Sequence, residues 1–149
     1  MRRSTHPERF LTAAESQRMA EAIARVERNT SAELNLLIVR HCWGKLHEKA
    51  RRLFYKHGLD RTAERNAVMI LLVTSNREFL IFGDQGIHQH VGPNFWLDVR
   101  DAMANEFRAG RVIEGLETGI GRIGEKLAAH FPAKANNPNE LSDEVANDR

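Results

Sequence analysis

The sequence predicts an α/β protein, a three-layer α/β/α sandwich with a small mixed sheet. Two short aliphatic segments, 34–39 and 67–74, are typical of buried strands. The second is apolar at nearly every position, which favours a central strand covered on both faces. Segments with apolar residues at helical spacing lie before, between and after these strands. The predicted order of elements is therefore αβαββαα.

The first predicted helix covers residues 12–29. Thr12 and Glu15 have the spacing of a capping box, in which each side chain accepts a hydrogen bond from the backbone N–H of the other residue. Asn29-Thr30-Ser31 interrupts the helical pattern and leads into the strand at 34–39. The pattern therefore places a helix directly before the first strand.

The segment between the two buried strands predicts a second helix, which ends at Gly58. Its apolar residues recur at helical spacing and basic residues occupy its other faces (Leu46, Ala50, Leu53 and Phe54; Lys45, Lys49, Arg51, Arg52 and Lys56). Because a helical crossover joins the two strands, we expect them to be parallel. A tight turn at 75–77 then predicts that the strand at 78–82 runs antiparallel to the one before it.

The rest of the chain predicts a loop and two helices. Residues 83–92 contain three glycines and predict a loop with special backbone demands. Pro93 suits the first position of the next helix, which Gly110 ends. A last helix follows from Val112 and stops at Phe131-Pro132.

At 149 residues the chain is long enough for one domain. We expect this domain to cover residues 10–131, with a flexible N-terminus at 1–9 and a polar acidic tail at 132–149 that is disordered or lightly docked. The longest apolar run, Val68 to Val73, is far shorter than the about 20 residues of a membrane-spanning helix. No signal peptide is evident, and one cysteine excludes an internal disulfide. We expect a cytoplasmic protein for which peripheral membrane association stays open.

The charge of the chain is small overall and unevenly distributed. A net charge of +2 does not indicate nucleic-acid binding. Residues 1–75 carry 14 Lys and Arg against 8 Asp and Glu, a net +6, whereas residues 76–149 carry 8 against 12, a net −4. The two halves form opposite faces or neutralise each other in the fold. The basic second helix has two interpretations: a solvated face, or a surface that contacts anionic lipid or an acidic protein.

Polar residues cluster where the predicted topology brings three strand ends to one edge of the sheet. Glu33 begins the first strand, Arg65 and Asn66 precede the second, and Asp84 follows the third. Asp98, in the first turns of the next helix, is a further candidate. Carboxylate and amide oxygens converging there predict a site for Ca²⁺ or Mg²⁺. The alternative is that Glu33 and Asp84 pair with Arg65 and cap backbone donors.

Two other motifs suggest chemistry and have simpler interpretations. The segment from Gly119 to Gly124 matches the dinucleotide-binding fingerprint, but it lies inside a helical pattern and not after a strand. We interpret it as small residues that allow a close helix contact. His88 and His90 present two imidazoles that suit a transition metal or simply face solvent.

A set of segments in a fixed order resembles the TPM domain family, known from thylakoid-lumen phosphatase-like proteins and photosystem II repair factors. The resemblance covers about residues 10–131, and the end of the chain is similar to that of a stand-alone bacterial branch. The segments that carry it are Phe10-Leu11-Thr12, Thr30 to Leu34, Arg65 to Val73, Arg77 to Ile87, Phe107 to Gly110, Gly115-Leu116 and Asn139 to Glu144.

The resemblance implies an α/β/α sandwich and divalent-cation binding in an acidic crevice at the sheet edge, with acid-phosphatase activity in some members. The chain departs from the family at two positions of that crevice. Asp84 stands where the family has the first glycine of a Gly-x-Gly, and Arg65 stands where many members carry an aspartate. An arginine in the crevice repels a cation, which weakens the case for both metal binding and catalysis.

We therefore hold three hypotheses. The first is a TPM-domain protein that binds Ca²⁺ or Mg²⁺ through Asp84 and Glu33, with Asn66 and Asp98 in support, and acts as a binding or adaptor module. The alternative is a metal-dependent, acid-phosphatase-like hydrolase. The third is an interaction module that docks on a protein partner, for example a membrane protein. Binding roles rank above an enzyme because this edge offers few carboxylates.

Overall fold

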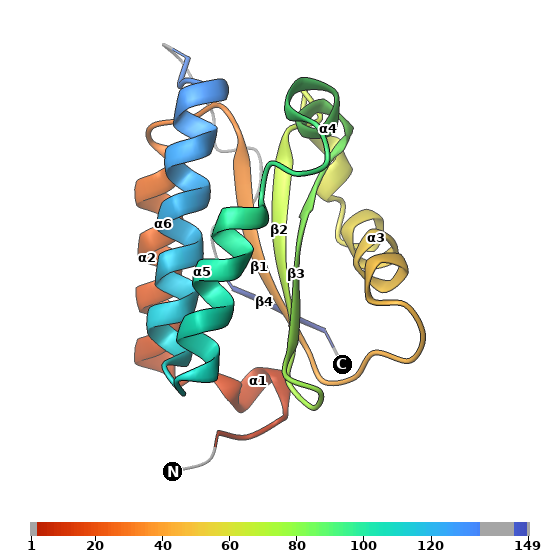
Figure 1. The fold of residues 1–149 in the computed structure, drawn as a ribbon, viewed down its shortest axis with the longest axis vertical. Coiled ribbons are helices and arrows are strands. Elements are labelled where there is room, and N and C mark those ends of the chain that lie inside the picture. The colour runs from red at the N-terminus through yellow and green to blue at the C-terminus, as the bar shows by residue number, and fades with distance from the viewer. Residues whose placement is uncertain (1–2, 135–144, 149) are drawn as a thin grey trace.

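The computed structural model describes residues 3–134 and 145–148. A four-stranded mixed sheet in the order β3-β2-β1-β4 forms the middle layer (Figure 1). β1 is parallel to β2 and to β4, and β2 is antiparallel to β3. The strands are β1 (Glu33–Val39), β2 (Ala67–Val73), β3 (Glu78–Gly83) and β4 (Ala146–Asp148).

Helices cover both faces of this sheet, which confirms the predicted α/β/α sandwich. Figure 1 shows α2, α5 and α6 on one side of the sheet and α3 on the other. The helices are α1 (Pro7–Phe10), α2 (Ala13–Glu27), α3 (Leu46–Lys56), the 3₁₀ helix η1 (Leu59–Arg61), α4 (Gln85–Val91), α5 (Leu97–Arg108) and α6 (Val112–His130).

The two central strands are buried along their whole length, as the aliphatic runs predict. All seven residues of β1 and all seven of β2 are buried. Because side chains alternate across a strand, each strand feeds two cores. Leu36 and Ile70 pack in the core under α2, α5 and α6, whereas Leu37 and Leu71 pack in the core under α3. The sheet is therefore apolar on both faces.

The predicted capping box is confirmed at the start of α2. The Thr12 hydroxyl accepts from the backbone N–H of Glu15 at 3.1 Å, and the Glu15 carboxylate accepts from the backbone N–H of Thr12 at 3.0 Å. Arg3 donates to both oxygens of Glu15, at 2.5 and 2.7 Å, and to the Phe10 carbonyl oxygen at 3.1 Å. These bonds tie Arg3 to α2 and to the Phe10 carbonyl; the predicted flexibility of residues 1–9 stays a prediction.

The glycine-rich part of α6 serves helix packing, in agreement with its interpretation as a helix contact. A Cβ on Gly124 would lie 2.5 Å from Cγ2 of Val26 in α2, and one on Gly119 would lie 2.4 Å from Sδ of Met103 in α5. A Cβ on Gly121 would meet no atom within 4 Å. Two of the three glycines of this motif therefore let neighbouring helices approach closely.

The prediction of a loop over residues 83–92 is wrong, because Gln85–Val91 forms helix α4. Asp84 caps this helix by accepting from the backbone N–H of Gln85 at 2.8 Å. Gly86 lets α4 approach the backbone at Glu64 closely, because a Cβ there would lie 2.2 Å from the carbonyl oxygen of Glu64. This glycine is therefore required by a close approach and not by a turn. Buried Ile87 anchors the helix on the core. Composition suggested a loop, whereas packing makes the segment helical.

The prediction that a helix begins at Pro93 is also wrong, since α5 begins at Leu97. Gly92 ends α4 with a φ of +81°, and the chain turns before α5 starts. Phe95 lies in this turn and packs edge-on against His130 at the end of α6, with 5.1 Å between ring centroids. The turn thus contacts the end of α6.

The short strand β4 was not predicted. It pairs in parallel with β1, with Leu37 opposite Ala146 and Val39 opposite Asp148. Its sequence, Ala-Asn-Asp, has no strand pattern, so only the exposed edge of β1 makes it a strand. The sequence assigned this segment to a polar tail; the part of that tail at 135–144 lies outside the described residues.

In the part of the chain that the structure describes, none of the helices combines the length and the apolar character needed to cross a membrane.

The glycines of α6 give a matched test of helix packing. Gly124→Ala should lower the free energy of unfolding by about 1–3 kcal/mol, because the added methyl group overpacks against Val26. Gly121→Ala should raise it by up to about 1 kcal/mol, because alanine favours helix and finds open space there. Urea unfolding measures both values. Equal effects of the two substitutions would contradict this account.

The ion pair at the start of α2 predicts a pH dependence. The hydrogen bond from Arg3 lowers the pKa of Glu15 from 4.5 to about 2. Because the pKa is lower in the folded state, this stabilisation is present above about pH 4.5 and is lost as the pH falls towards 2. Glu15→Gln should therefore flatten the decline in unfolding free energy over this range. Urea unfolding between pH 2 and 7 tests this, with Glu21→Gln in the same helix as the control.

Candidate functional site at the sheet edge

The polar residues predicted to meet at one sheet edge lie there, with one exception. Strand pairing places Glu33 opposite Ala67 and Val68 opposite Gly83. The start of β1, the start of β2 and the end of β3 therefore share an edge. Glu33, Asn66 and Asp84 flank these strand ends and are all buried. We call the group Ser31, Glu33, Glu64, Arg65, Asn66 and Asp84 the edge cluster.

The strongest interaction in the edge cluster joins Arg65 to Asp84. Nε of Arg65 donates to Oδ2 of Asp84 at 2.7 Å, and Nη2 donates to Oδ1 at 2.9 Å. The Asp84 side chain is 3% exposed and that of Arg65 is 30% exposed. Such a two-pronged contact is the strong geometry of an Arg–carboxylate pair, and it raises the pKa of Arg65 above its usual value.

The local backbone brings the two charges together. Arg65 has a φ of +51°, a left-handed conformation that side chains other than glycine adopt rarely. Its carbonyl oxygen accepts from the backbone N–H of Gly86 at 2.8 Å, and the backbone N–H of Asp84 donates to the Ala67 carbonyl oxygen at 2.9 Å. Tyr55 in α3 lies 3.4 Å from Nη2 of Arg65. The turn at Arg65 is therefore held by one backbone bond to α4, while the Arg65 side chain reaches Asp84.

Glu64 is a member of the cluster that sequence reasoning missed. Its Oε2 accepts from Ser31 Oγ at 3.1 Å and from Asn66 Nδ2 at 3.0 Å, and its Oε1 forms an ion pair with Lys134. The hydrogen bond from Lys134 lowers the pKa of Glu64 against the opposing effect of burial. The position of Glu64 directly before Arg65 and Asn66 could have placed it in the cluster. Its partner Lys134 could not have been predicted, because that residue lies in the segment assigned to the tail.

Asp98 does not join the edge cluster. Its side chain is 61% exposed and pairs with Lys126 of α6 at 3.3 Å. It was predicted to lie near Asp84 because α5 was expected to start at Pro93, directly after a short loop. Helix α4 and the following turn separate the two residues in the chain. The four predicted ligands are therefore not gathered at one point.

The two loop histidines are on α4. His90 packs against His130 and Phe131 of the last helical turn, with ring centroids 5.5 and 5.0 Å apart. Within the described ranges, 3–134 and 145–148, no three His, Cys, Asp or Glu side chains converge as metal ligands. His88 and His90 are both exposed. Among the described residues, these two histidines are therefore not joined by a third ligand that would complete a metal site.

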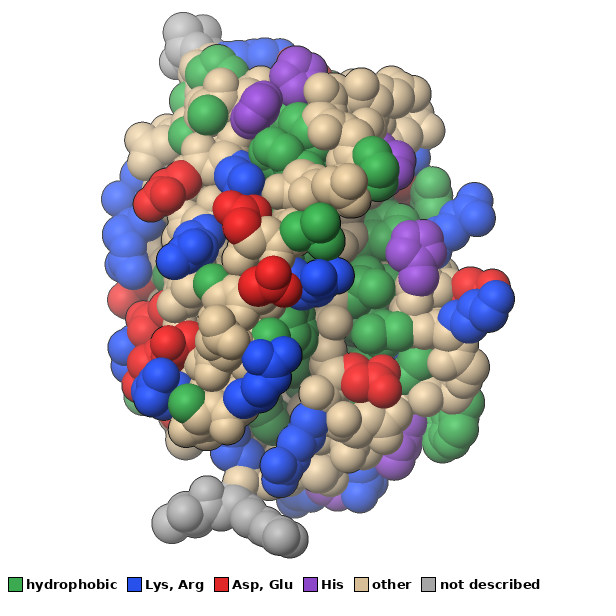
Figure 2. Space-filling view, viewed as in Figure 1, with side chains coloured by type: hydrophobic (Ala, Val, Ile, Leu, Met, Phe, Trp, Pro, Cys, Tyr) green, Lys and Arg blue, Asp and Glu red, His purple; other side chains and the backbone are tan. Residues whose placement is uncertain are grey.

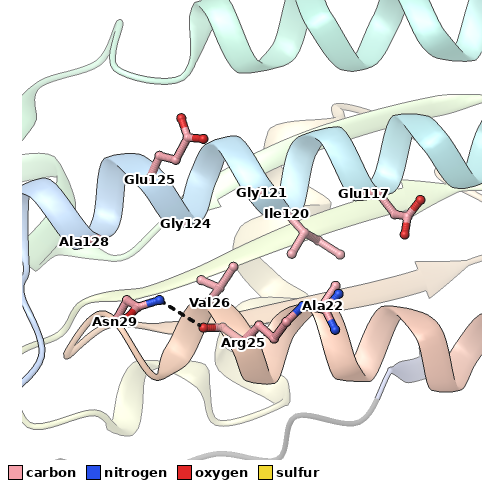
Figure 3. A pocket seen from close by; sticks show the side chains of 10 residues that line it. All are labelled: Ala22, Arg25, Val26, Asn29, Glu117, Ile120, Gly121, Gly124, Glu125 and Ala128. Atoms are coloured by element: carbon pink, nitrogen blue, oxygen red, sulfur yellow. Dashed lines mark hydrogen bonds between the residues drawn. The ribbon is translucent and has the colours of Figure 1, made fainter.

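A groove of about 410 Å³ lies elsewhere, between α2 and α6 (Figure 3). Small residues of both helices open it, and Arg25 and Glu117 lie at its rim. Asn29 donates to the Arg25 carbonyl oxygen at 3.4 Å within it. The remaining lining residues are Ala22, Val26, Ile120, Gly121, Gly124, Glu125 and Ala128. The groove shares no residue with the edge cluster.

Residues 4–126 match the model of the TPM domain. The chain belongs to the TPM domain family. A comparison with curated proteins gave no match. The fold of this TPM domain has counterparts among solved structures.

Two of those structures come from bacteria. The NMR structure of the BA42 protein from the psychrophilic bacterium Bizionia argentinensis is 31% identical with a TM-score of 0.90, covering 97% of this chain and 100% of that one. The solution NMR structure of the N-terminal domain of a protein from P. gingivalis is 20% identical with a TM-score of 0.65, covering 83% of each chain. The second likeness shows the fold alone.

The cation that the TPM family implies does not fit the edge cluster in this arrangement. Both carboxylate oxygens of Asp84 accept from Arg65, and Oδ1 also accepts from the backbone of Gln85. Glu64 is paired with Lys134. A cation such as Ca²⁺ needs several oxygens directed at one point. Here both oxygens of Asp84 and Oε1 of Glu64 meet cationic side chains of the protein itself, and Oε2 of Glu64 accepts from Ser31 and Asn66.

The ion pair predicts an asymmetry between single and double substitutions. Arg65→Asn should destabilise the protein more than the double substitution Arg65→Asn with Asp84→Asn, because the single change leaves a buried carboxylate without its counter-charge. Asparagine tolerates the positive φ at 65 and can still cap α4 at 84. Urea unfolding of the wild type, both single variants and the double variant measures the coupling. Additive losses would contradict a specific pair.

Proposed function

We propose that this TPM-domain protein is a binding module, not a hydrolase, and that Arg65 supplies the positive charge a divalent cation would supply at the sheet edge. The two hydrogen bonds from Arg65 to the buried carboxylate of Asp84 carry this proposal. The internal guanidinium of Arg65 stays charged, since arginine does not lose its proton in proteins, so it is a permanent counter-charge beside the Asp84 carboxylate. The edge then contributes stability and shape.

Divalent-cation binding stays a prediction under this proposal, and it depends on one structural change. Ca²⁺ or Mg²⁺ reaches Asp84 only if Arg65 is displaced from it. Glu33 and Asn66, which are buried at the same sheet edge, would then be the predicted supporting ligands. Wild-type affinity for a cation should therefore be weak, since binding must first break a two-pronged ion pair.

The phosphatase-like alternative requires more of this edge than its side chains offer. A metal-dependent hydrolase needs carboxylates that hold the cation and orient the attacking water. Asp84 and Glu64 are instead engaged with Arg65 and Lys134. A binding role needs neither step, so we rank it first.

Substitutions at position 65 test the proposal directly. Arg65→Asp replaces a positive by a negative charge near the cation, and this change of two charges alters four unit interactions with a divalent ion, each about 1 kcal/mol at 4 Å in water. Its affinity for Ca²⁺ should therefore exceed the wild-type affinity at least about tenfold. Arg65→Asn removes the positive charge alone and should fall between the two. Both side chains tolerate the positive φ of this position.

Backbone amide NMR during titration with Ca²⁺ and Mg²⁺ gives the affinities and locates the site. Shifts should be confined to residues near 33, 64–66 and 84–86 in Arg65→Asp. Tight cation binding by the wild type at these same residues would contradict the proposal. Phosphatase activity of the wild type that depends on added cation and disappears in Asp84→Asn would favour the hydrolase alternative.

A further inference from the structure

The loop that leads into α3 presents a tryptophan to solvent. The Trp43 residue is 82% exposed, while most large apolar side chains of this fold are buried. The His41 ring stacks on the indole with 4.9 Å between centroids, and its Nδ1 lies 3.1 Å from Oγ of Ser75 in the turn after β2. The indole is therefore supported by a ring that is itself tied to the scaffold, and it projects as an anchored apolar group.

Basic side chains continue from this loop along one side of α3. Lys45, Lys49, Arg52 and Lys56 are separated by four, three and four positions, which places them on one face of a helix. The buried residues Ala50, Leu53 and Phe54 lie on the face that packs on the sheet. We call Trp43, Lys45, Lys49, Arg52 and Lys56 the basic face.

The charge on this segment is largely uncompensated. Residues 40–61 contain seven Lys and Arg against two acidic residues, Glu48 and Asp60. Within the described part of the chain, Lys45, Lys49 and Arg52 form no ion pair. By contrast, α2, α5 and α6 each contain two Lys or Arg against three Asp or Glu, whereas α3 contains four against one. Positive potential therefore concentrates on α3.

The fold leaves this helix on the outside of the molecule. α3 covers the sheet face opposite to α2, α5 and α6 (Figure 1), and Lys45, Arg52 and Lys56 are exposed while Lys49 is half-buried. Figure 2 shows Lys, Arg and His side chains, with an acidic side chain among them, beside exposed hydrophobic atoms along the flank on which α3 lies. A partner approaching from this flank would meet charge and apolar area together.

We propose that the basic face docks on an anionic lipid bilayer. Lys and Arg near a membrane surface are attracted to acidic headgroups. Tryptophan favours the headgroup level of a bilayer, where one part of its ring is apolar and its N–H stays hydrated. Trp43 enters this level while Lys45, Lys49 and Arg52 face the lipid phosphates. The proposal stands apart from the edge cluster, because it uses none of those residues.

Vesicle co-sedimentation of the full chain tests the charge requirement. The protein should bind vesicles of phosphatidylcholine with phosphatidylglycerol, and not phosphatidylcholine alone, and added salt should release it. Each surface Lys or Arg contributes roughly fivefold in affinity for an acidic bilayer, so Lys49→Gln with Arg52→Gln should weaken binding roughly 25-fold. Arg25→Gln with Arg122→Gln, on α2 and α6, changes the net charge equally and should leave binding near the wild-type value.

Tryptophan fluorescence tests whether Trp43 enters the bilayer. In Trp96→Phe, the emission of the remaining tryptophan, Trp43, should shift to the blue with anionic vesicles and stay unchanged with neutral ones. Trp43→Ala should weaken co-sedimentation several-fold, whereas Leu97→Ala, a truncation of another exposed apolar residue, should not. Circular dichroism checks that each variant is folded.

Three results would overturn the proposal. The first is no binding to acidic vesicles at low salt. The second is an equal loss in the α3 pair and in the α2–α6 control pair, which would mean that net charge alone decides binding. The third is binding to an acidic polypeptide such as polyglutamate, with no binding to vesicles, which would assign the basic face to an acidic protein. None of these results bears on cation binding at Arg65, so the two proposals fail separately.

Discussion

The burial of β1 and β2 on both faces is the constraint on which the rest of the structure depends. Every residue of these strands is buried, so apolar surface must be covered above and below the sheet. Helices α2, α5 and α6 cover one face and α3 covers the other. The parallel pairing of β1 with β2 also sets their starting ends side by side, next to the end of β3. The location of the edge cluster is therefore a consequence of how the hydrophobic core is closed.

Burial also dictates the chemistry at that edge. Asp84 is almost inaccessible to solvent, and a carboxylate in such a place needs a positive partner or a set of donors. Arg65 supplies the charge, and the backbone of Gln85 supplies a further donor. Glu64 is satisfied in the same way by Lys134, Ser31 and Asn66. The neutralisation of these two carboxylates from within the protein is the basis of the proposed binding role.

The two helical layers differ in how much of their surface is used for packing. On one face, glycines of α6 bring it close to α2 and α5, so much of that layer is occupied by contacts between helices. On the other face, α3 uses one side to cover the sheet and carries its positive charge on the side that remains. Helix α3 and the loop before it thus complete the core and also carry the basic face, which consists of Trp43, Lys45, Lys49, Arg52 and Lys56. Core formation and surface chemistry are divided between opposite sides of one helix.

The sequence by itself determined the sandwich, the parallel pairing of β1 with β2, the capping box at Thr12 and the meeting of Glu33, Asn66 and Asp84 at one edge. These features follow from local periodicity and from the few topologies that short connections allow. Only the tertiary structure decided that residues 85–91 are helical and that Ala146–Asp148 adds a strand. It also decided that Asp84 forms an ion pair with Arg65, and Asp98 with Lys126. Those outcomes depend on contacts between distant segments, such as Gly86 against Glu64 and β4 against β1, and no local pattern encodes them.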